Sequence, residues 1–211
     1  MRDIPMFSTE HGVASLILRE IVYKKEAYVR IHSSDEIDEF LKDVTGFCKA
    51  AGAERIYATG HSVLEGYPVH TVLVGMICKR SLLRRSDAVT VQVSDQTIDQ
   101  WRELYNKRMS GVPNAATVTI ADAKKFVAEG AAYFVFRENI CIGLGKVSYN
   151  KIEAIISLVP GAGECVLLAL NNLVSGEFVQ VEVALNNDKA VKLYKRLGFE
   201  VVEEISKWYC I

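Results

Sequence analysis

Short runs of β-branched and aromatic residues alternate along the chain with longer segments whose apolar residues recur every three or four positions. In the first part of the chain, these runs predict strands over 13–18, 27–31, 54–58 and 70–78. A helix is predicted between the second and third strands, with an apolar face made of Ile37, Phe40, Leu41, Val44, Phe47, Cys48 and Ala51. Ser33 or Ser34 is expected to cap this helix, since Ser33 and Glu36 fit a capping box, and Gly52 is placed to end it.

The same alternation continues after residue 88, with a meander of strands in the middle. The expected elements are a strand over 89–93, a helix opened by Thr97, a helix begun by Thr119 and Asp122, a hairpin of 131–137 and 140–147 around Glu138 and Asn139, a strand over 152–159, an apolar helix over 164–174, a strand over 178–184, a helix over 188–197 ended by Gly198, and a last strand pair within 199–211. This order predicts an α/β protein, an α+β mixed sheet with helices on both faces.

A charged stretch over 79–87 separates these two parts. We therefore expect a smaller N-terminal α/β lobe over 1–86 and a second domain over 87–211. A strand–helix–strand pattern occurs in both parts at a constant offset. Ile31 falls on Ile156 and Ile56 falls on Val181, both 125 positions later (156 − 31 and 181 − 56). The N-terminal lobe is thus predicted to be a degenerate copy of part of the second domain.

The composition is that of a globular protein with no general affinity for polyanions. Half of the 211 residues are apolar, which is enough for a buried core, and 25 basic residues balance 26 acidic ones. A net charge of −1 predicts no nucleic-acid partner and no membrane surface as partner. The five cysteines are odd in number and form no C-x-x-C pair, so we expect reduced thiols and no metal. With no signal peptide and no apolar run of about 18 residues, a cytoplasmic location is expected.

The most specific motif lies near the C-terminus. It reads N-x-x-A-x-x-L-Y-x-x-L-G-F and is filled by Asn187, Ala190, Leu193, Tyr194, Leu197, Gly198 and Phe199. Asn187 is expected to cap a helix, and Gly198 permits the left-handed turn that ends it. Packing alone accounts for much of this motif, and a buried tyrosine with a satisfied hydroxyl is the alternative to a functional Tyr194.

A second motif joins a strand to the apolar helix through Pro160-Gly161-Ala162-Gly163. Backbone N–H groups and the dipole at a helix start hold anions, and glycines allow close approach. Glu164 places a negative charge at the same helix start. An ordinary strand-to-helix turn, in which Glu164 favours the helix dipole, is the alternative.

With its C-terminal motif and its element order from Val89, the sequence resembles the GNAT superfamily of acetyl-CoA-dependent N-acetyltransferases over about 123 residues. The resemblance implies a GNAT-like acyl-CoA N-acyltransferase fold with acetyl-CoA as cosubstrate, and a half-GNAT unit in the N-terminal lobe. It implies that Tyr194 acts as general acid on the departing thiolate and that Asn187 contacts the pantetheine arm. It also implies that the backbone of Leu158 and Val159 orients the thioester. The cofactor contacts it implies at the turn are Gly161, Ala162, Gly163 and Glu164.

The turn departs from the family pattern, Arg/Gln-x-x-Gly-x-Gly/Ala, because no Arg or Gln precedes Gly161. Glu182 matches an acidic residue found in some members and is the expected base that removes the ammonium proton, with an outward-facing strand glutamate as the alternative. Glu138 and Glu153 are weaker candidates. The predicted function is transfer of an acetyl group to a primary amine of a small molecule or peptide, by direct attack in a ternary complex.

Three points stay open at this stage. A catalytically degenerate GNAT-fold module that binds a ligand or a partner is the alternative to an enzyme. A longer acyl-CoA is compatible with the same motifs. The C-terminal stretch Trp208-Tyr209-Cys210-Ile211 is either a covered core strand or the edge of a homodimer.

Overall fold

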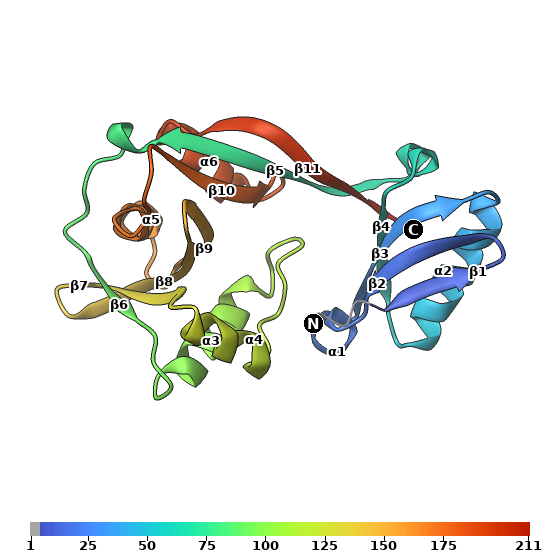
Figure 1. The fold of residues 1–211 in the computed structure, drawn as a ribbon, viewed down its shortest axis with the longest axis horizontal. Helices are drawn as coiled ribbons and strands as arrows, with labels where there is room; N and C mark the ends of the chain where they lie inside the picture. The colour runs from blue at the N-terminus through green and yellow to red at the C-terminus, as the bar shows by residue number, and fades with distance from the viewer. Residues whose placement is uncertain (1–4) are drawn as a thin grey trace. The chain divides into compact units, whose positions relative to one another are not determined.

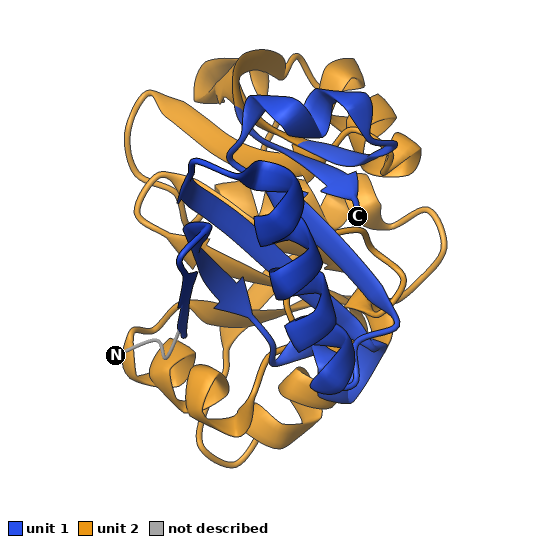
Figure 2. Cartoon of the chain, turned by 90° about the vertical axis from the view of Figure 1, so that its right-hand side faces the viewer, with its two compact units in different colours: residues 1–72, 205–211 blue, residues 73–204 orange. Residues whose placement is uncertain are grey.

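A computed structural model describes residues 5–211. Residues 1–4, on which the expectation about a signal peptide partly depends, lie outside the described residues. The chain divides into two compact units. Unit 1 comprises Met1–Val72 and Ile205–Ile211, and unit 2 comprises Leu73–Glu204 (Figures 1 and 2). The expected boundary after residue 86 therefore falls inside unit 2. Two continuous strands, β5 (Val69–Lys79) and β11 (Glu200–Cys210), carry the chain between the units, so no linker composition marks the division.

Unit 1 is a sheet with one long helix. Its elements are β1 (Met6–Thr9), β2 (Gly12–Ile17), α1 (Glu20–Lys24), β3 (Glu26–Ser34), α2 (Ile37–Ala50), β4 (Arg55–Thr59) and a 3-10 turn η1 (Ser62–Gly66). The strand order is β1-β2-β3-β4-β11. Strands β3 and β4 are parallel, and α2 is the crossover between them. The predicted helix face is buried at Phe40, Leu41, Val44 and Cys48, whereas Phe47 is 44% exposed.

Two expectations for unit 1 are wrong in detail. Ser33 and Ser34 do not cap α2, because β3 continues through them and pairs them with Val13 and Gly12 of β2. The residue before α2 is Glu36, and its side chain makes no capping hydrogen bond. The elements β1 and α1 were not predicted. Gly52 does follow the helix, with φ +98°.

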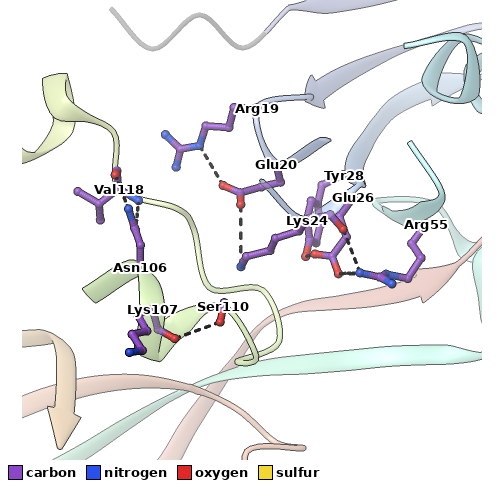
Figure 3. Close-up of polar contacts among 10 residues, drawn as sticks. All are labelled: Arg19, Glu20, Lys24, Glu26, Tyr28, Arg55, Asn106, Lys107, Ser110 and Val118. Carbon is purple, nitrogen blue, oxygen red and sulfur yellow. Dashed lines mark hydrogen bonds and ion pairs between the residues drawn. The ribbon is translucent and has the colours of Figure 1, made fainter. Parts of the chain in front are cut away.

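Polar contacts fix the start of β3 in unit 1. Tyr28 donates to Glu26 at 2.8 Å, and Arg55 of β4 pairs with the same carboxylate at 3.1 Å (Figure 3). Burial and the hydrogen bond to Glu26 raise the pKa of Tyr28. Glu20 of α1 is buried, with the side chains of Arg19 and Lys24 at 3.4 and 3.9 Å. Each buried carboxylate in this region therefore has a cationic neighbour, as burial of charge requires.

Unit 2 contains a mixed sheet with helices on both faces. Its further elements are a 3-10 turn η2 (Arg80–Leu82), β6 (Val89–Gln92), α3 (Ile98–Met109), α4 (Ile120–Ala128), β7 (Ala132–Arg137), β8 (Ile140–Ser148), β9 (Lys151–Ser157), α5 (Gly163–Asn171), β10 (Phe178–Ala184) and α6 (Asp188–Arg196). The strand order is β11-β5-β10-β9-β8-β7-β6. Helices α3 and α4 lie on one side of β7–β9 and α5 lies on the other (Figure 1). The predicted fold class is confirmed.

Residue alternation in β8 separates the two helical layers. Leu144 points into a core with Trp101 of α3, Phe134 of β7 and Ile156 of β9. The alternate positions, Gly143 and Gly145, face α5. A Cβ atom on Gly145 would lie 2.2 Å from Leu170 Cδ1 and 2.7 Å from the Ala154 carbonyl oxygen. The two glycines thus allow the apolar helix to approach the sheet closely.

The predicted local signals in unit 2 are largely confirmed. Thr119 and Asp122 form a reciprocal capping box at α4, and Glu138 and Asn139 both have positive φ in the β7–β8 turn. The expected last strand pair is wrong, because 200–210 is one strand. The side chains of residues 200–205 are all exposed, so this segment lacks the alternation that marks a half-buried strand.

The predicted internal repeat has the same strand register in both units. In unit 1, Glu26 pairs with Arg55 and Ala27 with Ile56 across parallel strands. In unit 2, Lys151 pairs with Gln180 and Ile152 with Val181, also across parallel strands. All four unit 2 residues lie 125 positions after their unit 1 counterparts (151 − 26 and 180 − 55). The offset of 125 positions seen in the sequence therefore relates residue pairs that occupy the same place in the parallel strands of each unit.

Candidate active site

The site begins where two parallel strands separate. Strands β9 and β10 are paired only at Lys151 with Gln180 and at Ile152 with Val181. Beyond these pairs, β9 continues to Ser157 and β10 continues to Ala184. Their carboxyl ends therefore diverge instead of closing the sheet. Divergent parallel strands leave backbone groups facing the opening, and ligands of open α/β sheets bind at such places.

The glycine turn follows directly from β9. Gly161 has φ +80°, and a Cβ atom there would meet nothing within 4 Å, so the turn surface is open. Helix α5 begins after Ala162 without a side-chain cap. The N–H groups of its first turn, Gly163, Glu164 and Cys165, have no acceptor within the helix. The donor set therefore fits a pyrophosphate held by the backbone and the helix dipole.

The charge of Glu164, which the sequence suggested would oppose a phosphate, is compensated. Its two carboxylate oxygens accept from Arg84 at 2.7 Å and from Arg196 at 2.9 Å. Arg84 precedes β6 by several residues, and Arg196 ends α6. Two guanidinium groups thus stand at the start of α5, although no Arg or Gln precedes Gly161 in the sequence.

Tyr194 lies on the helix that contacts this turn. Leu193, its neighbour on α6, has Cδ2 3.4 Å from the position of a Cβ atom on Gly163. Tyr194 itself is 6% exposed and packs on the ring of Phe199, with centroids 5.6 Å apart. Burial raises the pKa of the Tyr194 phenol to about 12. The two predicted motifs therefore meet, and the phenol is fully protonated at neutral pH.

Asn187 occupies the start of α6, as predicted, and accepts a hydrogen bond from the Ala190 N–H at 3.4 Å. Asn186–Lys189 and the loop residues Gly111–Pro113 line a cavity of about 270 Å³. Asn106 anchors this loop, because its side chain bonds both the N–H and the carbonyl of Val118 (Figure 3). Ser110 closes the end of α3 by donating to the Lys107 carbonyl. A fixed loop thus faces the start of α6.

Two of the three carboxylates predicted as bases form ion pairs. Glu182 of β10 is 40% exposed at its side chain and forms an ion pair with Lys151. Within residues 5–211 it makes no hydrogen bond with Tyr194. Glu153 pairs with Lys146, and Glu138 lies in the β7–β8 turn. The role of Glu182 as a base stays a prediction.

Sequence reasoning missed a third cation at the end of β9. Arg108 of α3 donates to the Leu158 carbonyl at 2.8 Å, and the Leu158 N–H donates to the Ile142 carbonyl at 2.9 Å. Both backbone groups of Leu158 are therefore occupied. Leu158 and Val159 are the two residues predicted to orient a thioester. Since the Leu158 N–H is already bonded, the Val159 N–H is the one available to a ligand between the strand ends. No sequence pattern identifies Arg108, because it lies 50 positions from Leu158 and meets it only in the folded chain.

Other kinds of site are not found in the part of the chain that the structure describes. No group of three or more His, Cys, Asp or Glu side chains is arranged to hold a metal ion there. All five cysteines are free thiols. No helix in residues 5–211 is both long and apolar enough to cross a bilayer.

By sequence, no family model and no functionally curated protein matches the chain. Its structure is similar to that of a functionally unknown conserved protein from Staphylococcus epidermidis, with a TM-score of 0.62 and 13% identity over 100% of this chain and 94% of that one. It is also similar to a GCN5-related N-acetyltransferase from Sphaerobacter thermophilus, with a TM-score of 0.59 and 9% identity over 95% of this chain and 75% of that one.

A GCN5-related N-acetyltransferase from Kribbella flavida matches with a TM-score of 0.58 and 14% identity, over 99% of this chain and 89% of that one. This chain has the GNAT fold. The predicted fold resemblance is confirmed, and the matches extend over both units. At 9–14% identity, these likenesses show the fold alone.

Proposed function

We propose that this protein transfers an acetyl group from acetyl-CoA to a primary amine. The observation that carries the proposal is the divergence of β9 and β10 after two paired positions, directly before an uncapped helix start. An extended thioester placed between the strand ends would bring its pyrophosphate to the turn. An ordinary βαβ unit, with its strands paired throughout, offers no such opening.

The cosubstrate would be held largely by backbone groups. We assign the pyrophosphate to the N–H groups of Gly161, Gly163 and Glu164, because the Ala162 N–H already donates to the Val159 carbonyl. Arg84 and Arg196 would offset the charge of Glu164. The pantetheine arm would run between β9 and β10 toward Asn187. The thioester oxygen would accept from the Val159 N–H, a donor fixed before the reaction begins, which is the arrangement that stabilises developing negative charge most effectively.

The chemistry requires a free amine and a protonated leaving group. The amine nitrogen forms the new C–N bond, the C–S bond breaks, and the sulfur takes a proton. We assign Tyr194 as the donor of that proton, because its phenol is protonated throughout the neutral range. Glu182 would receive the ammonium proton through water once its ion pair with Lys151 opens. Most of the acceleration would come from holding amine and thioester together.

Calorimetric titration with acetyl-CoA, with CoA and ATP as controls, tests the proposal. Micromolar binding of acetyl-CoA and CoA, equivalent to roughly −8 kcal/mol, is the expected result. Loss of this heat in Gly163→Asp, at a helix position without positive φ, with an unchanged melting temperature, would support a ligand at the turn. Absence of heat and of any thermal shift at millimolar acetyl-CoA would overturn the acetyltransferase proposal.

A second candidate is a GNAT-fold module that binds a ligand without catalysis. The carboxylate of Glu164 at the start of α5 and the ion-paired Glu182 favour it. Binding of acetyl-CoA without turnover across a panel of small-molecule and peptide amines would support this candidate. Parallel titrations with longer acyl-CoA thioesters would define the acyl group.

A further inference from the structure

Unit 2 has a second cavity, of about 280 Å³, whose lining includes no residue of α6 or of the glycine turn. It is formed by Arg84, Arg85, Ser86, Asp87, Arg137, Cys165 and Leu168. The segment 84–87 precedes β6, Arg137 ends β7, and Cys165 and Leu168 lie on α5. Two segments that are far apart in the sequence thus bring three arginines to this cavity, and α5 supplies its uncharged wall.

The charges of this cavity are not balanced. Asp87 is the sole acidic residue in its lining, and its carboxylate lies 3.3 Å from Arg137. Arg84 pairs with Glu164, which stands outside the lining. Arg85 has no acidic partner within residues 5–211. Two of the three guanidinium groups in the lining are thus ion-paired, and Arg85 is the one whose positive charge no carboxylate among the described residues balances.

We propose that this cavity is a binding site for a phosphate monoester dianion, either inorganic phosphate or the phosphate group of a small metabolite. Guanidinium forks bind phosphate oxygens in pairs, and a dianion can draw on the unpaired Arg85 and on Arg84, whose partner Glu164 also pairs with Arg196. The Ser86 hydroxyl adds a neutral polar group, and Leu168 adds an apolar wall for a small organic part. The volume admits a phosphate with a few carbon atoms.

Arg84 links this cavity to the start of α5. A phosphate that recruits Arg84 leaves Glu164 with Arg196 alone, so the helix start becomes more negative. This second part of the inference rests on the proposed function. It predicts that phosphate in the cavity weakens acetyl-CoA binding and that acetyl-CoA weakens phosphate binding by the same factor, as linkage requires.

Titration of the full chain with inorganic phosphate and with glycerol phosphate, at constant ionic strength and with acetate as control, tests the site. We expect phosphate binding to weaken about tenfold in Arg85→Gln and in Arg137→Gln. Arg30→Gln, which changes an exposed arginine of β3 in unit 1, is the matched control and should bind as the wild type does. No phosphate binding, or equal binding in all variants, would overturn the proposal. Tighter binding of glycerol phosphate than of phosphate would identify a phosphorylated metabolite as the ligand class.

Repeating the acetyl-CoA titration at saturating phosphate tests the coupling. The acetyl-CoA Kd should rise in the wild type and stay constant in the Arg85→Gln/Arg137→Gln double variant. A rise of the same size in both proteins would mean direct competition at α5 and would overturn the coupling. If acetyl-CoA does not bind at all, the proposed function fails, while the phosphate titration still decides the cavity.

Discussion

The two strand–helix–strand segments of this chain share a register and differ in how they end. In unit 1, β3 and β4 stay paired over five positions, from Glu26 with Arg55 to Arg30 with Thr59. In unit 2, β9 and β10 separate after two. The unit 1 turn carries Asp35 and Glu36 and no glycine, whereas the unit 2 turn carries Gly161 and Gly163. A parallel βαβ scaffold is thus no site by itself. Both crossover helices start without a side-chain cap, so the early divergence of the strands and the glycine turn are what distinguish the segment to which we assign the site.

The largest expected effect is that of Tyr194→Phe. Because the phenol is assigned to donate the proton that the departing sulfur takes, kcat should fall by about 10²–10⁴, with the acetyl-CoA Kd unchanged. Stopped assays of amine acetylation, with calorimetry of the same variant, measure both quantities. The control is Tyr149→Phe, in an exposed turn of the same unit. Full activity in Tyr194→Phe would contradict the assignment of Tyr194 as proton donor and would leave it a packing role only.

The packing of the two crossover helices can be compared with one pair of glycine substitutions. Gly145→Ala drives a methyl group against Leu170 of α5 and should destabilise the fold by about 1–3 kcal/mol. Gly46 lies on α2, and a Cβ atom there would have no neighbour within 4 Å. Gly46→Ala should therefore stabilise the fold by about 1 kcal/mol. Denaturant melts of both variants measure the difference. Equal effects would mean that α5 is no closer to its sheet than an open helix position is.

Glu164→Gln should sharpen the contrast between the turns. Removing the carboxylate frees Arg84 and Arg196 for the ligand, so the acetyl-CoA Kd should fall by about 3–10-fold. Asp35→Asn, in the corresponding turn of unit 1, should leave that Kd unchanged. Weaker binding in Glu164→Gln would show that the carboxylate orders the two arginines more than it repels phosphate.

The smallest effect concerns pH. The pKa of Tyr194 is about 12 in the folded protein against about 10 in an unfolded chain, because burial favours the neutral phenol. Its contribution to stability is therefore complete below pH 10 and is lost as the pH rises from 10 to 12. Melting temperatures of the wild type should fall more steeply over that window than those of Tyr194→Phe. Parallel curves would indicate an ordinary pKa for Tyr194.

Much of the fold follows from local signals. The Thr119–Asp122 capping box, the Glu138-Asn139 turn and the left-handed Gly198 each depend on neighbouring residues, and the structure confirms all three. The five-residue α1 was missed because it is too short to show a helical period. The prediction of two strands in place of β11 is wrong because residues 200–205, which are exposed on both faces, lack the alternation of apolar and polar residues.

The candidate site was less predictable. The sequence motifs indicate Tyr194 and the glycine turn, and in the structure Leu193, the neighbour of Tyr194 on α6, contacts Gly163 of that turn. The arginines could not be found, because Arg84 lies 80 positions from Glu164 and Arg196 lies 32 positions from it. An ion pair between exposed side chains imposes no local pattern on sequence. Such contacts exist only once the chain has folded.

Because β5 and β11 each run through both units, truncation of the chain at the unit boundary affects both units. A fragment encoding residues 1–72 lacks 205–211, and with it Trp208 and Tyr209, whose side chains belong to the apolar clusters of unit 1. A fragment encoding 73–211 carries that missing strand as an unsatisfied tail. No single cut therefore separates the two units: unit 2 is one continuous stretch, 73–204, whereas unit 1 is assembled from both ends of the chain.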